Sequence, residues 1–133
     1  MSPEFQAFAS GFPVTALHAA ASLVLWAAGV SLYLALFKDP PSAINAAGAL
    51  RLCSALIGLA MPLAVSLTAS ASLIEIGLWG LVLILVQLLG FRLIDLCFAR
   101  SAEAAAQGGT EGAGVIAAAR FAAALIVSAA VAG

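Results

Sequence analysis

The stretch that decides the fold class reads LIEIGLWGLVLILVQLLGFRL and runs from Leu73 to Leu93. A helix needs about 20 apolar residues to cross the hydrocarbon core of a bilayer. The large polar side chains of this stretch are only three, Glu75, Gln87 and Arg92. The stretch lacks the alternation of apolar and polar residues that a membrane β-barrel strand requires. We therefore predict a transmembrane helix over 73–93.

Three further stretches of the same kind occur in the chain, at about 13–37, 52–69 and 113–132. The 133 residues are 65% hydrophobic and only 8% charged, which leaves too little polar surface for a soluble domain. We predict an all-α polytopic membrane protein, a single domain over 1–133 with four transmembrane helices. The polar segment at 101–112 is expected to be a mobile cytoplasmic loop.

The cationic side chains predict the orientation of these helices. Lys38 and Arg51 lie in or beside the first loop, and Arg92 and Arg100 lie near the start of the third. The N-terminal segment, the turn after the second span and the C-terminus carry no Lys or Arg. Cytoplasmic loops of membrane proteins are enriched in Lys and Arg, so we expect both termini to be periplasmic. The first span follows a segment without Lys or Arg, unlike a cleavable signal peptide, and is expected to be retained.

A faint internal repeat suggests that the four helices form two tandem two-helix hairpins. The stretch at 45–50, NAAGAL, resembles EGAGVI at 111–116, and in this register Ser54 corresponds to Arg120. The first loop contains Pro40 and Pro41, which stop the preceding helix, and Ser42 is the expected cap of the next one.

Small residues follow one face of each central helix. Close backbone approach through small residues is how helices associate in lipid, so the first interpretation is a packing seam. The second interpretation is a hinge or a pore-lining face, because a proline inside a helix removes one backbone hydrogen bond. The candidate residues are Ser54, Gly58, Pro62, Ser66, Gly77 and Gly80.

Glu75 is an acid near the start of an apolar helix, and two interpretations stand. Ser72 and Glu75 have the spacing of a capping box. In this motif the serine hydroxyl accepts from the backbone N–H of the glutamate, and the glutamate carboxylate accepts from the backbone N–H of the serine. Alternatively, Glu75 is an ion or proton site at the outer mouth of the bundle, and His18 lies at a comparable depth to pair with it.

Arg120 lies inside the fourth span, about 10 Å from its start at 1.5 Å per residue. Its long side chain can extend back to the headgroups, or it can face the bundle interior, where an arginine is a candidate functional residue that favours anions. Gln87 and Gly58 lie at nearly the same depth, so in the inward-facing arrangement a ring of small and polar groups can form. Asp95 is expected to form a local ion pair with Arg92, three residues earlier.

No catalytic motif is present. The sequence lacks a nucleophile elbow, an HExxH motif and a glycine-rich phosphate loop, so we expect no enzymatic activity. With one histidine and two separated cysteines, we expect no metal site and no cofactor, and we expect no nucleic-acid partner.

The middle of the chain resembles the YjfL-like family of small bacterial inner-membrane proteins, a family defined by a domain of unknown function. The resemblance implies a four-helix protein of the bacterial plasma membrane with a part in envelope homeostasis, and it implies no activity. Glu75 stands where the family usually has an aspartate. The shared features are Asn45-Ala46-Ala47, Gly58, Pro62-Leu63, the turn Ser70-Ala71-Ser72, an acid at Glu75, Trp79-Gly80 and Gln87-Leu88.

The first functional hypothesis is a structural or interaction protein. We expect it to contact the lipid bilayer, to form a homo-oligomer and to bind a cytoplasmic protein through 101–112. The alternative is an oligomeric ion channel or small transporter that uses Glu75 and Arg120.

Overall fold

The computed structural model describes residues 2–37 and 45–133, and within them every regular element is a helix. Four helices are long and apolar enough to cross a membrane, so the predicted class, an all-α protein with four spanning helices, is confirmed. The elements are α1 (Pro3–Phe37), α2 (Ala46–Ala69), α3 (Leu73–Cys97), α4 (Ala99–Ala106) and α5 (Thr110–Ala132).

Three helices begin earlier than the apolar runs predicted, α5 by three residues and α1 and α2 by more. Helix α1 begins at Pro3, where proline suits the first helical position, and the Ser2 hydroxyl accepts a hydrogen bond from the Phe5 amide at 3.3 Å. Helix α2 is capped by Asn45, whose side chain accepts from the Gly48 amide at 2.7 Å. The expected cap, Ser42, lies outside the described residues. Hydropathy locates the apolar run, whereas caps decide where a helix begins.

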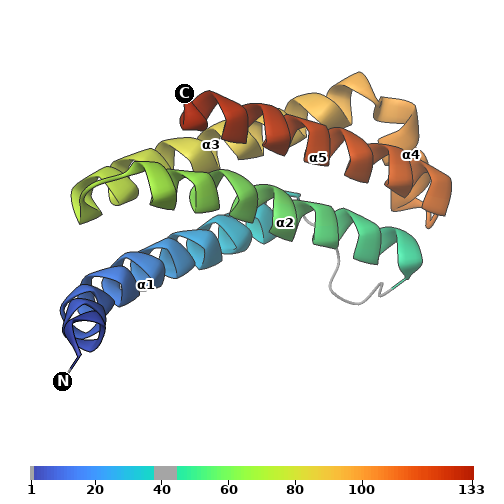
Figure 1. Cartoon of the computed structure of the whole chain (residues 1–133). Helices are drawn as coiled ribbons and strands as arrows, with labels where there is room; N and C mark the ends of the chain where they lie inside the picture. Colours follow the sequence, from blue (N-terminus) through green and yellow to red (C-terminus); the bar gives the residue numbers. More distant parts are fainter. Residues whose placement is uncertain (1, 38–44) are drawn as a thin grey trace.

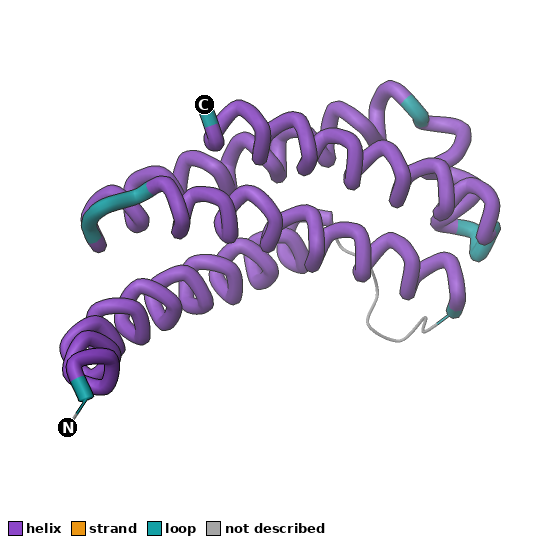
Figure 2. The backbone as a smooth tube through the Cα atoms, in the orientation of Figure 1, coloured by secondary structure: helices purple, strands orange, loops and turns teal. Residues whose placement is uncertain are grey.

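The long helices run side by side along one direction, with α1 at one edge of the bundle and α5 at the other (Figure 1). Helix α2 packs most extensively against α5, and α1 contacts both α2 and α3. The N-terminal part of α1 diverges from the bundle (Figure 2), and its side chains up to Leu17 are exposed. The core lies between the first three helices and contains Tyr33, Ala55, Leu59, Leu63, Ile84, Leu88 and Phe91.

Buried positions of α2 and α5 share a common spacing. The register of the proposed repeat pairs residues 66 positions apart, because Ser54 corresponds to Arg120. The same offset relates four pairs of buried residues on the two helices, which is the pattern expected if the helices use equivalent faces. These pairs are Ala47 with Ala113, Ser54 with Arg120, Gly58 with Ala124, and Pro62 with Ser128.

The segment expected to be a loop at 101–112 is mostly helical. Helix α4 covers Ala99–Ala106, and α5 already begins at Thr110. Alanine has the highest helix propensity, and Ala105 packs in a cluster with Ala47 and Ala113. The connection between the helices is therefore short.

Glycine is required at this connection. Gly108 has a φ of 92°, a left-handed conformation that glycine adopts at little cost. At Gly112 a Cβ would approach the Ser101 carbonyl oxygen to 2.5 Å, so a side chain there would prevent the close contact of α5 with α4.

Candidate functional site

Arg120 faces the interior of the bundle. It lies about 15 Å along α5 from the first residue of that helix, at 1.5 Å per residue, and its side chain is 0% exposed. Its Nη2 donates to both carboxylate oxygens of Asp95, at 3.1 and 3.2 Å. Its Nη1 donates to the Tyr33 hydroxyl at 2.9 Å and to the Arg51 carbonyl at 3.3 Å. Of the two interpretations of Arg120, the inward-facing one is confirmed.

Three aromatic rings surround the guanidinium. The Arg120 Cζ lies 5.0 Å from the centroid of Phe91, 5.4 Å from that of Tyr33 and 5.5 Å from that of Phe37. A cation within about 6 Å of a ring centroid is attracted by the ring quadrupole. The rings also exclude water, which strengthens the electrostatic interaction between Arg120 and Asp95. Helices α1, α2, α3 and α5 all contribute to this cluster, which we call the Arg120 cluster.

Asp95 therefore pairs with a different arginine from the one predicted. The local pair with Arg92 is wrong, because Arg92 instead lies over the Phe37 ring, with its Cζ 5.2 Å from the centroid. Asp95 is 14% exposed and turns toward the interior. A buried arginine without an anionic partner is costly, so the long-range pair takes precedence over the exposed pair three residues apart.

The Arg120 cluster stabilises the buried guanidinium with an anion from the same chain, the Asp95 carboxylate. A second anion would have to displace the bidentate Asp95 carboxylate. The Arg120 Nε has no hydrogen-bond partner among the described residues, but it lies inside the aromatic enclosure. Chemically, the arrangement joins four helices and uses both terminal nitrogens of Arg120, and only the buried Nε–H is left without a partner within the described part of the chain.

The ring of Gly58, Gln87 and Arg120 that an inward-facing arginine allows is only partly present. Gly58 and Gln87 are neighbours, because a Cβ on Gly58 would lie 3.6 Å from the Gln87 amide nitrogen and 2.8 Å from the Phe91 ring. Gln87 is 1% exposed, and within the described ranges neither of its amide atoms has a hydrogen-bond partner. Gln87 thus occupies the layer adjacent to the Arg120 cluster without bonding to it.

The small-residue face of α2 packs inside the bundle. Ser54, Gly58, Pro62 and Ser66 are all buried. Their burial against other helices of the same chain fits the interpretation as a packing seam.

The corresponding face of α3 is divided between packed and open positions. At Gly80 a Cβ would approach the Leu25 side chain to 2.5 Å, which places this glycine at a close helix contact. At Gly77 a Cβ would meet nothing within 4 Å, so no helix of the same chain packs closely at this glycine, and its packing role stays a prediction.

Glu75 and Ser72 form the predicted capping box. The Ser72 hydroxyl accepts from the Glu75 amide at 3.3 Å, and the Glu75 carboxylate accepts from the Ala71 amide at 2.7 Å. The carboxylate of Glu75 thus accepts from Ala71, the residue before the cap, rather than from Ser72 itself. His18 is half-buried on α1, and the structure shows no ion pair between His18 and Glu75.

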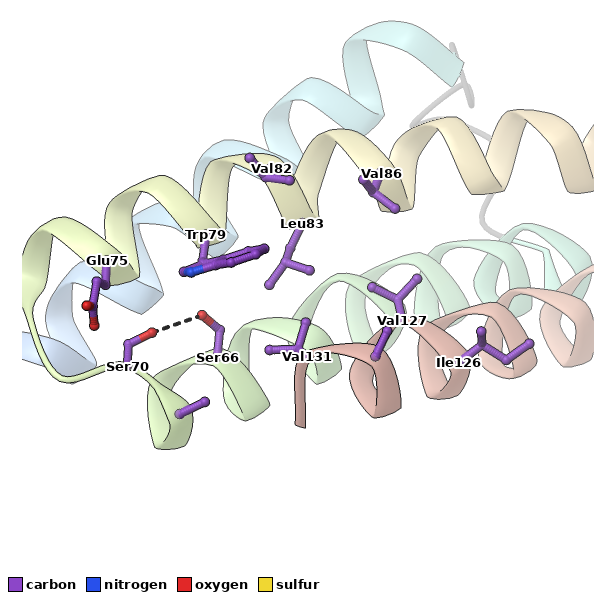
Figure 3. A pocket seen from close by; sticks show the side chains of 12 residues that line it. Ser66, Ser70, Glu75, Trp79, Val82, Leu83, Val86, Ile126, Val127 and Val131 are labelled. Atoms are coloured by element: carbon purple, nitrogen blue, oxygen red, sulfur yellow. Dashed lines mark hydrogen bonds between the residues drawn. The ribbon is translucent and has the colours of Figure 1, made fainter. Parts of the chain in front are cut away.

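A groove opens beside Glu75 (Figure 3). Glu75 lies where α3 begins, whereas Asp95 of the Arg120 cluster lies where α3 finishes. The groove has a volume of about 570 Å³. It lies between the first half of α3 and the last turns of α5, over the end of α2. Its lining residues are Ser66, Ala69, Ser70, Glu75, Trp79, Val82, Leu83, Val86, Ile126, Val127, Ala130 and Val131.

The partners of Arg120 were not identified from the sequence. Tyr33 is the only tyrosine in the chain, and Asp95 is the acid nearest the end of the 73–93 stretch. In an antiparallel arrangement the end of α3 lies beside the start of α5, so helix direction combined with depth could have suggested Asp95. The three-residue spacing between Arg92 and Asp95 instead favoured Arg92 as the partner of Asp95.

Comparison with known proteins identifies the family. No curated protein and no solved structure matches the chain. A family model covers residues 7–131, nearly the whole sequence, including α2 and α3 in full and most of α1 and α5. This bears out the expected membership in a family of unknown function. The chain belongs to the family described as Domain of Unknown Function (DUF350).

Proposed function

We propose that this protein is a non-enzymatic protein of the bacterial inner membrane that forms a homo-oligomer and serves envelope homeostasis through protein interactions. The observation that carries the proposal is a row of small residues on the outer face of α5. Gly114, Ala118 and Ala122 are four residues apart and therefore lie on one face of the helix. Ala118 and Ala122 are exposed, and a Cβ at Gly114 would meet nothing within 4 Å.

This α5 row is suited to a second membrane helix. In lipid the hydrophobic effect does not join helices, and small residues four apart allow the close backbone contact that does. The small residues of α2, Ser54, Gly58 and Ser66, are already buried inside the bundle. The α5 row is free to pack against another copy of the chain.

The Arg120 cluster supports an interaction role over conduction. An arginine that lines an ion pathway must present its charge to passing ions. Here both terminal nitrogens of Arg120 bond to Asp95, Tyr33 and the Arg51 carbonyl. The charge serves to hold the helices of the bundle together.

The orientation follows from the arginines. Arg51, Arg92 and Arg100 lie at the end where α2 begins and α3 finishes. By the bias of Lys and Arg toward cytoplasmic segments, this end faces the cytoplasm. Both termini are then periplasmic, and α4 lies on the cytoplasmic side.

Helix α4 is the proposed contact for a cytoplasmic protein. It buries Ala105 and exposes Glu103, Ala104 and Ala106, with Gln107 exposed directly after it. Replacing Glu103 and Gln107 with lysine should abolish co-purification of that partner while the helices remain inserted, because both side chains point outward. If every co-purifying protein remains bound, α4 is not the contact.

The oligomer is tested by counting subunits in liposomes with single-molecule photobleaching of labelled protein. The parent should show more than one subunit per spot. Ala118→Leu should shift the distribution toward single subunits, whereas Ala28→Leu, at an exposed alanine of α1, should leave it unchanged. A parent that is monomeric at all densities, or equal effects of the two substitutions, would rule out the α5 row as the interface.

Ion flux into the same liposomes separates this proposal from the channel alternative. An interaction protein should conduct no ions above the background of empty liposomes. Flux that changes with Glu75→Gln would instead support a channel, since that substitution removes the charge and retains a glutamine suited to the capping box.

A further inference from the structure

The groove beside Glu75 has the size and the shape of a small-molecule site. Its volume of about 570 Å³ falls within the range of about 300–1,000 Å³ that is typical of ligand pockets. Trp79 and Ile126, on opposite walls, are 55% and 71% exposed, so the groove opens on the surface of the bundle. It extends about 16 Å along α3 from Glu75 to Val86, at 1.5 Å per residue.

The polar groups of the groove are gathered at one end. Figure 3 shows Glu75, Ser70, Ser66 and Trp79 together, with the valine and isoleucine side chains farther along. Ser66 is 2% exposed, and its hydroxyl has only a long contact of 3.5 Å with the Ser70 hydroxyl. Buried hydroxyls ordinarily have a closer partner. The polar end therefore has unused hydrogen-bonding capacity.

The charge of this end is negative. One oxygen of the Glu75 carboxylate accepts from the Ala71 amide, and the other has no hydrogen-bond partner in the part of the chain that the structure describes. The described arginines all lie toward the opposite end of the bundle, at Arg51, Arg92, Arg100 and Arg120. An anionic headgroup at this end would be repelled, whereas a cation would be attracted.

We propose that this groove binds an amphiphile with an ammonium head and an alkyl tail. The head lies against the Glu75 carboxylate, where the exposed Trp79 ring adds a cation–π contact. The tail lies along Val82, Val86 and Ile126. Glu75 and Trp79 lie on α3, apart from the α5 row and from α4, whereas Ile126 and Ala130 continue the α5 row at the same four-residue spacing. Binding of the ammonium head at Glu75 is therefore tested separately from the proposed oligomer and its partner.

Native mass spectrometry of the whole protein in a neutral glycol detergent tests the site. Dodecylammonium, dodecanol, phosphatidylethanolamine and phosphatidylglycerol are titrated separately. One dodecylammonium should bind per chain, at least tenfold more tightly than dodecanol, which has the same tail without the charge. Comparable binding of phosphatidylethanolamine would identify a lipid headgroup as the source of the ammonium, whereas its absence would identify a free hydrophobic cation. Phosphatidylglycerol should bind weakly in both cases.

Two substitutions examine the two ends of the groove. Glu75→Gln should weaken dodecylammonium binding by roughly tenfold, the scale of a hydrogen bond to a charged group, and leave dodecanol binding unchanged. Glu103→Gln, at an exposed acid on α4, is its control. Ala130→Phe fills the groove and should weaken both ligands, whereas Ala129→Phe, next to it but outside the lining, should not.

Two results would overturn the proposal. The first is equal affinity of the parent protein for dodecylammonium and dodecanol. The second is unchanged dodecylammonium binding in both Glu75→Gln and Ala130→Phe, with the helical circular dichroism of the parent retained.

Discussion

Arg120 shows how a chain of this composition accommodates a charge within an apolar helix. The desolvation of a guanidinium is offset only when an anion, further hydrogen bonds and a suitable enclosure are all present. Asp95, Tyr33 and the Arg51 carbonyl provide the bonds, and three aromatic rings provide the enclosure. Sequence alone predicted that Arg120 was a residue of interest, but it could not choose between the headgroups and the interior. That choice depended on Tyr33 and Asp95, which lie far from Arg120 in the sequence.

Gly58 and Gly77, which lie on the predicted packing faces, also differ in ways that the sequence does not show. Gly58 and Gly77 look equivalent in the sequence, yet a Cβ would lie 2.8 Å from the buried Phe91 ring at Gly58 and meet nothing at Gly77. Small size in a sequence permits close packing but does not reveal which neighbour, if any, uses it.

Gly58→Ala should therefore destabilise the bundle, by about 1–3 kcal/mol, the usual cost of overpacking. Gly77→Ala is the matched control and should be neutral or stabilising by up to about 1 kcal/mol, because alanine has the higher helix propensity. The free energy of unfolding in bicelles checks both. Equal effects of the two substitutions would contradict the close contact at Gly58.

At the scale of elements, the four long helices were predictable because each carries an apolar run long enough to span a bilayer. The starts of α1 and α2 were not, since Ser2 and Asn45 act through cap geometry that hydropathy does not report, whereas α3 begins at the predicted Leu73, after the predicted cap Ser72. Helix α4 was missed because its alanines were interpreted together with the glycines that follow it. The hydrophobic pattern of eight residues is too short to separate a surface helix from a loop.

The contact between α4 and α5 depends on Gly112. Gly112→Ala should open this contact, because a Cβ there would approach the Ser101 carbonyl oxygen to 2.5 Å, and backbone atoms cannot move aside as a flexible side chain can. Limited proteolysis after Arg100 should become faster. Gly114→Ala, where a Cβ meets nothing within 4 Å, should leave cleavage at the parental rate. Protection of Arg100 in both variants would show that the α4–α5 contact tolerates the side chain.

At the scale of the whole molecule, the two ends of the bundle have opposite character. One end carries the arginines and the short helix α4, and the other carries Glu75 and the groove. Four apolar helices fit a multi-pass membrane protein, and the family match covers two of them in full and most of the other two.

The proposed orientation is tested by fusing alkaline phosphatase, which is active only in the periplasm, after Gly133. The fusion should be active, because the arginine-bearing end is retained in the cytoplasm. A fusion inserted after Gly108, between α4 and α5, should be inactive. The reverse pattern of activities would invert the topology and place α4 outside.

The Arg120–Asp95 pair is tested most directly by the free energy of unfolding of four proteins in bicelles: the parent, Arg120→Met, Asp95→Leu and the double variant. Asp95→Leu leaves the buried Arg120 without its anion and should cost about 3–5 kcal/mol, whereas Arg120→Met leaves Asp95, which is 14% exposed, without its partner and should cost less. The double variant should lose much less than the sum of the two, because no buried charge remains. Strictly additive losses, or an Arg120→Met variant as stable as the parent, would contradict the conclusion that this pair holds the bundle together.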